Sequence, residues 1–324
     1  MRPIPLGWSL LLGLGLAAGW AASAFRRDRD AARRRVQGRS AVIPTRFGAL
    51  EYAVAGRGPP LLMIHGTGGG FDQGLRFAEG ILERGVRVIA PSRFGYLRSG
   101  FPPDPSSANQ AEALVDLLDH LGISRLVVAG GSAGALSAAE LALRHPDRCA
   151  GLVLLVPAAN VRNRDPVEMG AAAESVVRRL LSSDLLFWIA LRLAPGRLIG
   201  TLLATDPALL ARVPPAERAR AFAILRELMP IGARARGMLN DARLAGRPAR
   251  MEFARIRVPT LVISAEDDRF GTAATARDIV AAVPGARLVM LPEGGHVWLG
   301  HAGRVADEVA DFVHALSPCT GRRG

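Results

Sequence analysis

The sequence of 324 residues contains no lysine, so all 41 of its basic side chains are arginine. Loops that bind nucleotide phosphates through Gly-Lys-Ser/Thr are therefore excluded. Only two cysteines occur, Cys149 and Cys319, and their spacing fits neither a metal site nor a disulfide framework. Aromatic residues make up only 5% of the chain, so a core has to consist mainly of leucine, valine, isoleucine and alanine.

Acidic residues are too few to balance the arginines, and the formal net charge is +12. Residues 1–40 hold eight arginines and two aspartates, which is half of this excess. Because the cluster adjoins an apolar stretch, the charge indicates contact with a membrane surface rather than with nucleic acid.

The apolar stretch covers residues 4–25 and carries no charge. As a helix it would be about 33 Å long, which matches a hydrocarbon core of about 30 Å. The arginines that follow favour an uncleaved anchor in residues 1–25, with a basic linker at 26–40 and the remainder in the cytoplasm. The alternative is a signal peptide cleaved near Ala22-Ser23-Ala24, followed by export.

Short apolar runs alternate with segments of helical periodicity over the rest of the chain. Runs of this length without internal alternation are typical of strands buried on both faces of a parallel sheet. The alternation of strands and helices predicts an α/β fold with a doubly wound sheet. The eight predicted strands are residues 41–47, 50–55, 61–65, 86–91, 125–129, 151–156, 259–264 and 287–291.

The alternation stops between residues 157 and 258, where the pattern is helical throughout. A loop of about 100 residues is implausible in a compact domain. We therefore predict one core made of residues 41–157 and 251–318, interrupted by a helical subdomain at 158–250.

Gly130-Gly131-Ser132-Ala133-Gly134 fits the G-x-S-x-G pattern and lies between a predicted strand and a predicted helix. A serine on such a sharp turn needs small neighbours two residues before and after it, because adjacent elements approach closely there. We expect Ser132 to be a nucleophile.

Acyl transfer also needs two backbone N–H groups that bind the developing oxyanion. One is expected from Ala133, directly after the nucleophile. The second is expected from the glycine-rich loop that follows strand 61–65, at Thr67 or alternatively at Gly68. His65 begins this loop and is predicted to brace it.

An acid and a base follow the last two predicted strands. Glu266, Asp267 and Asp268 come after strand 259–264, and carboxyl ends of parallel strands are where such sheets place their sites. We choose Asp268 as the acid that orients the histidine, with Asp267 as the alternative. His296 follows two glycines after the last strand and is the expected general base.

These motifs, in this order, resemble the α/β-hydrolase superfamily. The resemblance implies that residues 158–250 are the helical cap over an eight-stranded, mostly parallel sheet. Two positions depart from the pattern: Ser92 stands where an acid is usual, and Ala265 where a glycine is usual. The resemblance covers residues 42–316 and rests on His65-Gly66-Thr67-Gly68, Val88-Ile89-Ala90-Pro91, Gly95, Ser99, Gly130–Gly134, Pro259–Ile263, Asp268 and Gly295-His296.

The expected reaction is hydrolysis of a carboxylic ester or lactone through an acyl-enzyme, without a metal or organic cofactor. The alternatives are hydrolysis of a carbon–carbon bond, as in the meta-cleavage hydrolases that the chain also resembles, and peroxide-dependent perhydrolysis. The first would require a carboxylate-binding arginine, such as Arg234, Arg236 or Arg243. The alternative outside the enzymes is a non-catalytic scaffold tethered to a membrane.

Overall fold

The computed structural model describes residues 6–161, 175, 178–179, 181–246 and 249–317. Its centre is one sheet of eight strands in the order β1-β2-β4-β3-β5-β6-β7-β8, which confirms the predicted fold class. β2 runs antiparallel to both of its neighbours, and the other pairs are parallel. The strands are β1 Ala41–Thr45, β2 Gly48–Ala55, β3 Pro60–Ile64, β4 Arg87–Pro91, β5 Leu126–Gly131, β6 Cys149–Leu155, β7 Thr260–Ala265 and β8 Arg287–Leu291.

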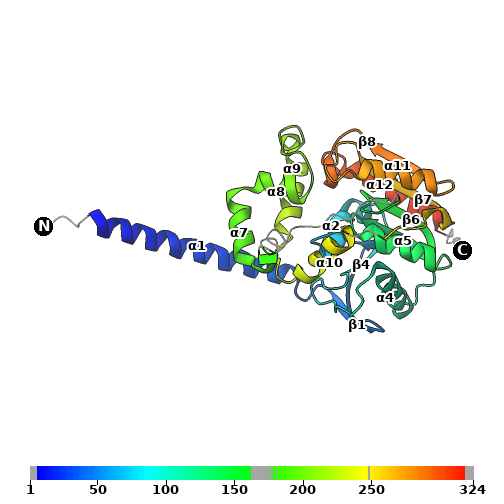
Figure 1. Cartoon of the computed structure of the whole chain (residues 1–324), viewed down its shortest axis with the longest axis horizontal. Helices are drawn as coiled ribbons and strands as arrows, with labels where there is room; N and C mark the ends of the chain where they lie inside the picture. Colours follow the sequence, from blue (N-terminus) through cyan, green and yellow to red (C-terminus); the bar gives the residue numbers. More distant parts are fainter. Residues whose placement is uncertain (1–5, 162–174, 176–177, 180, 247–248, 318–324) are drawn as a thin grey trace, which may run out of the picture.

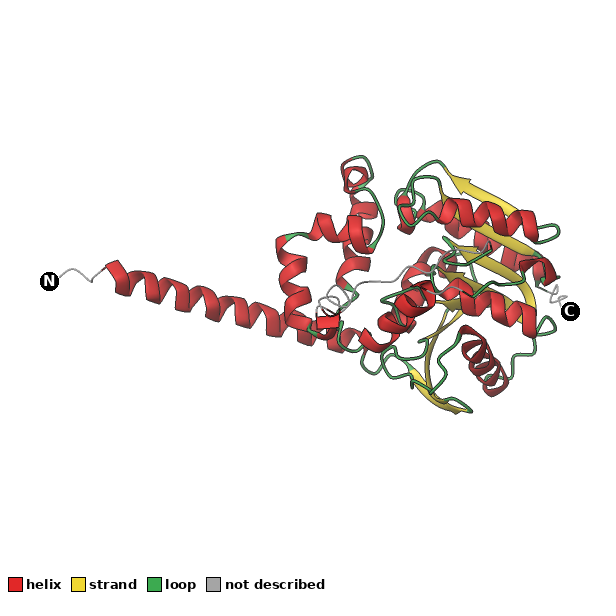
Figure 2. Ribbon diagram, in the orientation of Figure 1, coloured by secondary structure: helices red, strands yellow, loops and turns green. Residues whose placement is uncertain are grey.

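Helices cover both faces of the sheet (Figure 2). Successive residues of a strand point to opposite faces, so Val128 packs in one core cluster and Val127 in the other. The first cluster includes α4 (Ser107–His120), α5 (Gly134–Arg144) and α11 (Thr272–Ala282). The second cluster includes α2 (Phe71–Phe77), α3 (Glu79–Glu83) and α12 (Ala302–Leu316).

In the segment between β6 and β7, the described residues form helices joined by short loops, and none of them is in a strand. Its helices pack on one another around Phe187, Ile199 and Leu225, which are nearly inaccessible to solvent, so this cap has a small core of its own. In Figure 1, α7, α8 and α9 form a group beside the sheet, joined to it through α10. The elements are α7 Asp184–Leu193, α8 Pro195–Leu202, η1 Pro207–Ala211, α9 Pro215–Arg226, α10 Ala235–Gly246 and η2 Phe253–Arg255.

The N-terminal helix, α1, runs from Leu6 to Val36 and extends away from the body of the molecule (Figure 1). The prediction of a basic linker at residues 26–40 needs correction, because residues 26–36 continue this helix and pack on the cap. Phe25 meets the ring of Trp188 edge-on at 5.7 Å, and Asp28 accepts a hydrogen bond of 2.9 Å from the Trp188 indole. Apolar and polar contacts to α7 therefore hold a helical segment in place, although its many arginines had led us to expect a linker.

Within the described part of the chain, no single helix combines the length and the apolar character that a membrane crossing needs, although α7 and α8 do so jointly across a bend of 111°. This result gives no support to the span predicted in residues 1–25, which stays a prediction.

Candidate active site

Ser132 lies on the sharp turn between β5 and α5. Its backbone has a φ of +50°, a left-handed conformation that costs free energy in any residue with a Cβ. The turn is held on both sides, because the Ser132 N–H donates to the carbonyl of Leu155 and its own carbonyl accepts from Ala135. The hydroxyl is thereby fixed above the carboxyl end of the sheet.

The two glycines that frame Ser132 are required by close packing. A Cβ at Gly130 would lie 2.5 Å from the carbonyl oxygen of Gly134. A Cβ at Gly134 would lie 2.5 Å from the carbonyl oxygen of His65. Backbone atoms occupy both places and cannot rotate away, so this turn excludes side chains at these positions.

The structure brings Ser132, His296 and Asp268 together. The distance from His296 Nε2 to Ser132 Oγ is 2.8 Å, and that from His296 Nδ1 to Asp268 Oδ2 is also 2.8 Å. His296 lies in the short 3-10 helix η3, Gly295–Val297, which follows β8. Gly295 has a φ of +59°, and a Cβ there would collide with Thr205 of the cap, so the glycine lets this turn pass beneath the cap.

The tautomer of His296 follows from its partners. Burial raises the pKa of the Asp268 carboxyl, but hydrogen bonds from His296, Thr272 and the Phe270 amide outweigh burial, so its pKa lies below the ordinary value. An ionised carboxylate can only accept, so His296 Nδ1 carries the proton. Nε2 is then free to accept the proton of the Ser132 hydroxyl.

Asp267 and Asp268 have different tasks. Asp267 accepts hydrogen bonds from the N–H groups of Gly294 and Gly295, at 3.2 and 2.8 Å, and so holds the loop that carries the histidine. Asp268 alone reaches the imidazole. Thr272, which belongs to no recognisable motif, donates its hydroxyl to Asp268 and contacts the Ser264 hydroxyl at 2.9 Å.

Two backbone N–H groups near Ser132 have no acceptor among the described residues, those of Thr67 and Ala133. Gly68, the alternative to Thr67, donates its N–H to the hydroxyl of Tyr96 at 3.3 Å and is therefore already engaged. The loop is close enough for the purpose, because a Cβ at Gly66 would lie 3.1 Å from the Cβ of Ser132.

A family model of the alpha/beta hydrolase fold matches residues 59–299, which include every residue of this site. The chain belongs to this family.

Known proteins that are similar to this chain cover different shares of it. The uncharacterized hydrolase YcgS of Bacillus subtilis is 37% identical over 107 residues, which are 33% of this chain and 37% of that protein. A putative carbamate hydrolase, RutD, of Klebsiella pneumoniae is 29% identical over 254 residues, 74% of this chain and 85% of that protein. The solved structure of an alpha/beta hydrolase fold protein from Nakamurella multipartita superposes with a TM-score of 0.69 at 28% identity, over 86% of this chain and all of that one.

In this α/β-hydrolase, His65 braces the loop of the N–H groups, as expected. Its Nε2 accepts from the Arg93 amide at 2.9 Å, so its Nδ1 carries the proton and donates to the Gly66 carbonyl at 2.7 Å. Burial and the neighbouring Arg93 cation hold the pKa of His65 well below the ordinary value, which keeps the ring neutral.

Arg93 ties this loop to the cap. Its guanidinium binds both carboxylate oxygens of Asp241, on α10, at 2.7 Å each, and its Nε donates to the His65 carbonyl at 3.0 Å. The hydroxyl of Tyr96 donates to the same carboxylate at 2.5 Å. No local motif marks Arg93 or Asp241, because their partners lie 28 and 148 residues away.

The described residues contain no group of three or more histidine, cysteine, aspartate or glutamate side chains arranged to hold a metal ion. The site chemistry that these residues can perform themselves is proton transfer and nucleophilic attack.

Proposed function

We propose that the protein is a serine hydrolase that cleaves carboxylic esters or lactones through an acyl-enzyme. The observation that carries this proposal is the chain of contacts from Ser132 Oγ to His296 Nε2 and from His296 Nδ1 to Asp268, each 2.8 Å long. These distances are within the range at which an imidazole takes a hydroxyl proton as the oxygen attacks.

Ser132 Oγ bonds to the carbonyl carbon while His296 takes its proton, and the negative charge on the former carbonyl oxygen is stabilised by the N–H groups of Thr67 and Ala133. The ester C–O bond then breaks, and His296 gives the proton to the departing alcohol. In the second half, water attacks the acyl carbon, His296 takes a proton from it, and Ser132 regains its own. Asp268 stays ionised and stabilises the imidazolium in both halves.

A fluorophosphonate probe tests the nucleophile. The wild-type chain should be labelled at one serine, and Ser132→Ala should not be labelled although it retains the wild-type circular dichroism spectrum. Labelling of the Ser132→Ala variant, or none of the wild type, would contradict the proposal and favour a non-catalytic scaffold.

Carbon–carbon bond hydrolysis is the second candidate, and the arginines that it would use are placed unfavourably for it. Arg234 is fully buried, and its terminal nitrogens bind Asp72 and the Gly69 carbonyl, so its charge is already paired with Asp72. Arg236 and Arg243 are exposed. Rates on p-nitrophenyl esters, an aryl carbamate and a ring-fission dienoate should therefore rank the esters first, and formation of peracid from acetate and peroxide would instead indicate perhydrolysis.

We also propose that the start of α1 attaches the chain to a membrane, with the hydrolase domain in the cytoplasm. The proposal is supported by the uncharged residues 4–25, by the arginines that follow, and by Leu16 and Trp20, which are 74% and 70% exposed. Deletion of residues 1–20 keeps Ala24 and Phe25, which contact the cap, and should move activity from the membrane pellet to the supernatant. Full-length protein found in the supernatant would refute this attachment.

A further inference from the structure

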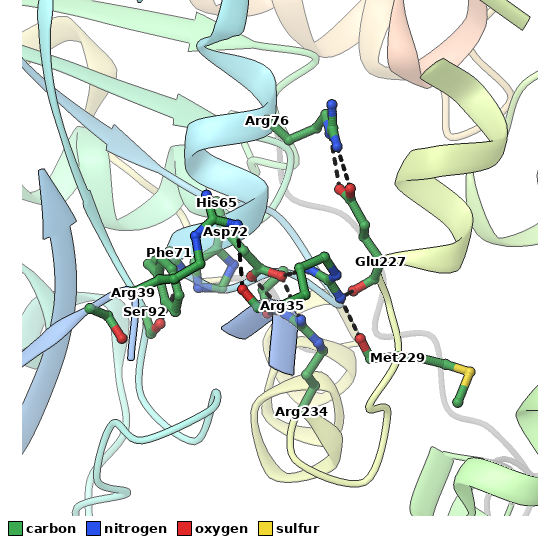
Figure 3. Close-up of polar contacts among 12 residues, drawn as sticks. Arg35, Arg39, His65, Phe71, Asp72, Arg76, Ser92, Glu227, Met229 and Arg234 are labelled. Carbon is green, nitrogen blue, oxygen red and sulfur yellow. Dashed lines mark hydrogen bonds and ion pairs between the residues drawn. The ribbon is translucent and has the colours of Figure 1, made fainter. Parts of the chain in front are cut away.

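The last turn of α1 enters the junction between the sheet domain and the cap (Figure 3). Arg35 forms an ion pair with Asp72 of α2 and donates to two carbonyls just after α9, to that of Glu227 at 2.9 Å and to that of Met229 at 2.5 Å. A single side chain of the N-terminal helix therefore contacts both halves of the hydrolase domain.

Asp72 is shared by two arginines. Arg234, which is fully buried, binds the two carboxylate oxygens of Asp72 at 3.1 and 2.8 Å, and Arg35 binds one of the same two oxygens. Burial raises the pKa of Asp72, but the two cations outweigh it and lower the pKa to about 2. Arg35, Asp72 and Arg234 are called the arginine junction below.

The arginine junction is bonded directly to the loop of the proposed oxyanion hole. Arg234 donates to the carbonyl of Gly69, in that loop, as well as to Asp72. Gln73, which follows Asp72 in the first turn of α2, accepts the N–H of Gly66 at 3.1 Å. The loop is thus fixed on both sides of Thr67, and both attachments depend on the position of the first turn of α2.

We propose that Arg35 is a positioning residue for the oxyanion hole, acting through Asp72, so that the rate of acyl transfer depends on the docked position of α1. The inference rests on the proposed function, because it gives the Thr67 amide its role. An oxyanion interaction is stronger in the transition state than in the bound ester, so a misplaced donor lowers kcat and leaves KM nearly unchanged. Loss of a contact that merely holds the cap together would instead lower the fraction of folded enzyme or raise KM.

Arg35→Met tests this in the full chain, with Arg34→Met as the matched control. Arg34 lies on the same helix, is exposed, and loses the same charge. Turnover of a p-nitrophenyl ester is measured per active site, after titration with a fluorophosphonate, so that unfolded protein does not enter kcat. Inhibition by a trifluoromethyl ketone, which forms a tetrahedral oxyanion adduct with the serine, gives a second readout.

We expect Arg35→Met to lower kcat by about tenfold and to keep KM within about twofold of the wild-type value. Its affinity for the trifluoromethyl ketone should fall by about tenfold. Arg34→Met should match the wild type in all three. If Arg35→Met has the kcat and inhibitor affinity of Arg34→Met, or changes KM alone, the inference is wrong. If Arg35→Met does not fold, Arg35→Gln replaces it, since glutamine can still donate to a carbonyl but cannot pair with Asp72, and the same outcomes decide.

The outcome separates this inference from the proposed function. A wild-type chain that is not labelled and hydrolyses no ester contradicts the serine hydrolase itself. A wild-type chain that is labelled and active, with Arg35→Met equal to Arg34→Met, contradicts only the role of Arg35.

Discussion

The triad and the arginine junction are both buried polar networks, but different parts of the fold build them. Ser132 follows β5 directly, and Asp268 and His296 lie in the short turns after β7 and β8, so the hydrogen-bonded sheet places all three of them. The arginine junction joins α1, α2 and the segment before α10, which share no hydrogen-bonded sheet. The rigid sheet therefore places the groups proposed to transfer protons, whereas the loop proposed to bind the oxyanion also depends on helices outside the sheet.

Among the residues placed by the sheet, substitution of Asp268 is expected to have the largest effect on activity. Asp268→Asn should lower kcat by about 10⁴-fold, because an amide no longer selects the tautomer in which His296 Nε2 accepts a proton. Asp267→Asn is the matched control, and it should cost about tenfold or less because it only weakens the bonds to Gly294 and Gly295. Steady-state kinetics on one ester compare the two, and equal losses would show that Asp268 has no special place.

The arginine junction is broken most severely at Asp72. Asp72→Asn leaves the buried Arg234 and the half-buried Arg35 without their carboxylate and should lower the free energy of unfolding by about 3 kcal/mol at pH 7. Urea denaturation of both proteins measures the difference.

The same pair of proteins gives a pH test. Because the folded-state pKa of Asp72, about 2, lies below the unfolded value of 3.8, its charge stabilises the fold fully above pH 3.8 and less as the pH falls towards 2. The difference in unfolding free energy between wild type and Asp72→Asn should therefore be smaller at pH 3 than at pH 5. A difference that stays constant between these values would show that the carboxylate is not held ionised by Arg35 and Arg234.

A smaller effect is expected at the turn that carries Ser132. Gly130→Ala forces a Cβ to within 2.5 Å of backbone atoms and should destabilise the fold by about 1–3 kcal/mol, with loss of labelling by the fluorophosphonate. Gly131→Ala places its Cβ at 3.5 Å from the Phe77 ring, an ordinary contact, and should change stability by about 0.5 kcal/mol or less. Thermal unfolding distinguishes them, and equal melting temperatures would contradict the packing argument.

The smallest effect is expected for another ion pair between cap and sheet domain. Arg212 and Glu293 lie 2.8 Å apart, but their side chains are 61% and 46% exposed. Arg212→Ala should therefore change the free energy of unfolding by about 0.5 kcal/mol or less and leave kcat unchanged. A loss of kcat as large as that of Arg35→Met would mean that any link between cap and sheet positions the oxyanion hole, and the comparison with the arginine junction would lose its meaning.

The site residues differ in how far the sequence could predict them. Ser132 and His296 have glycines beside them and follow apolar strands, so local pattern and strand order were enough to select them. Asp268 could be narrowed only to the pair with Asp267, because neighbouring residues on one turn point in different directions and their partners decide their tasks. Arg35 was predicted as part of an exposed linker, since its partners lie 37 and 192 residues further along the chain.

The eight strands, the helical segment between the sixth and seventh strands, and the positions of Ser132, Asp268 and His296 after strands could be predicted from the sequence, because short apolar runs and glycine-framed turns act through neighbours in sequence. The folded chain was needed to show which carboxylate meets His296, which amide of the glycine-rich loop is left free, and where the end of α1 docks. These contacts join segments that are far apart in the chain, and local sequence patterns do not predict the distances between such segments.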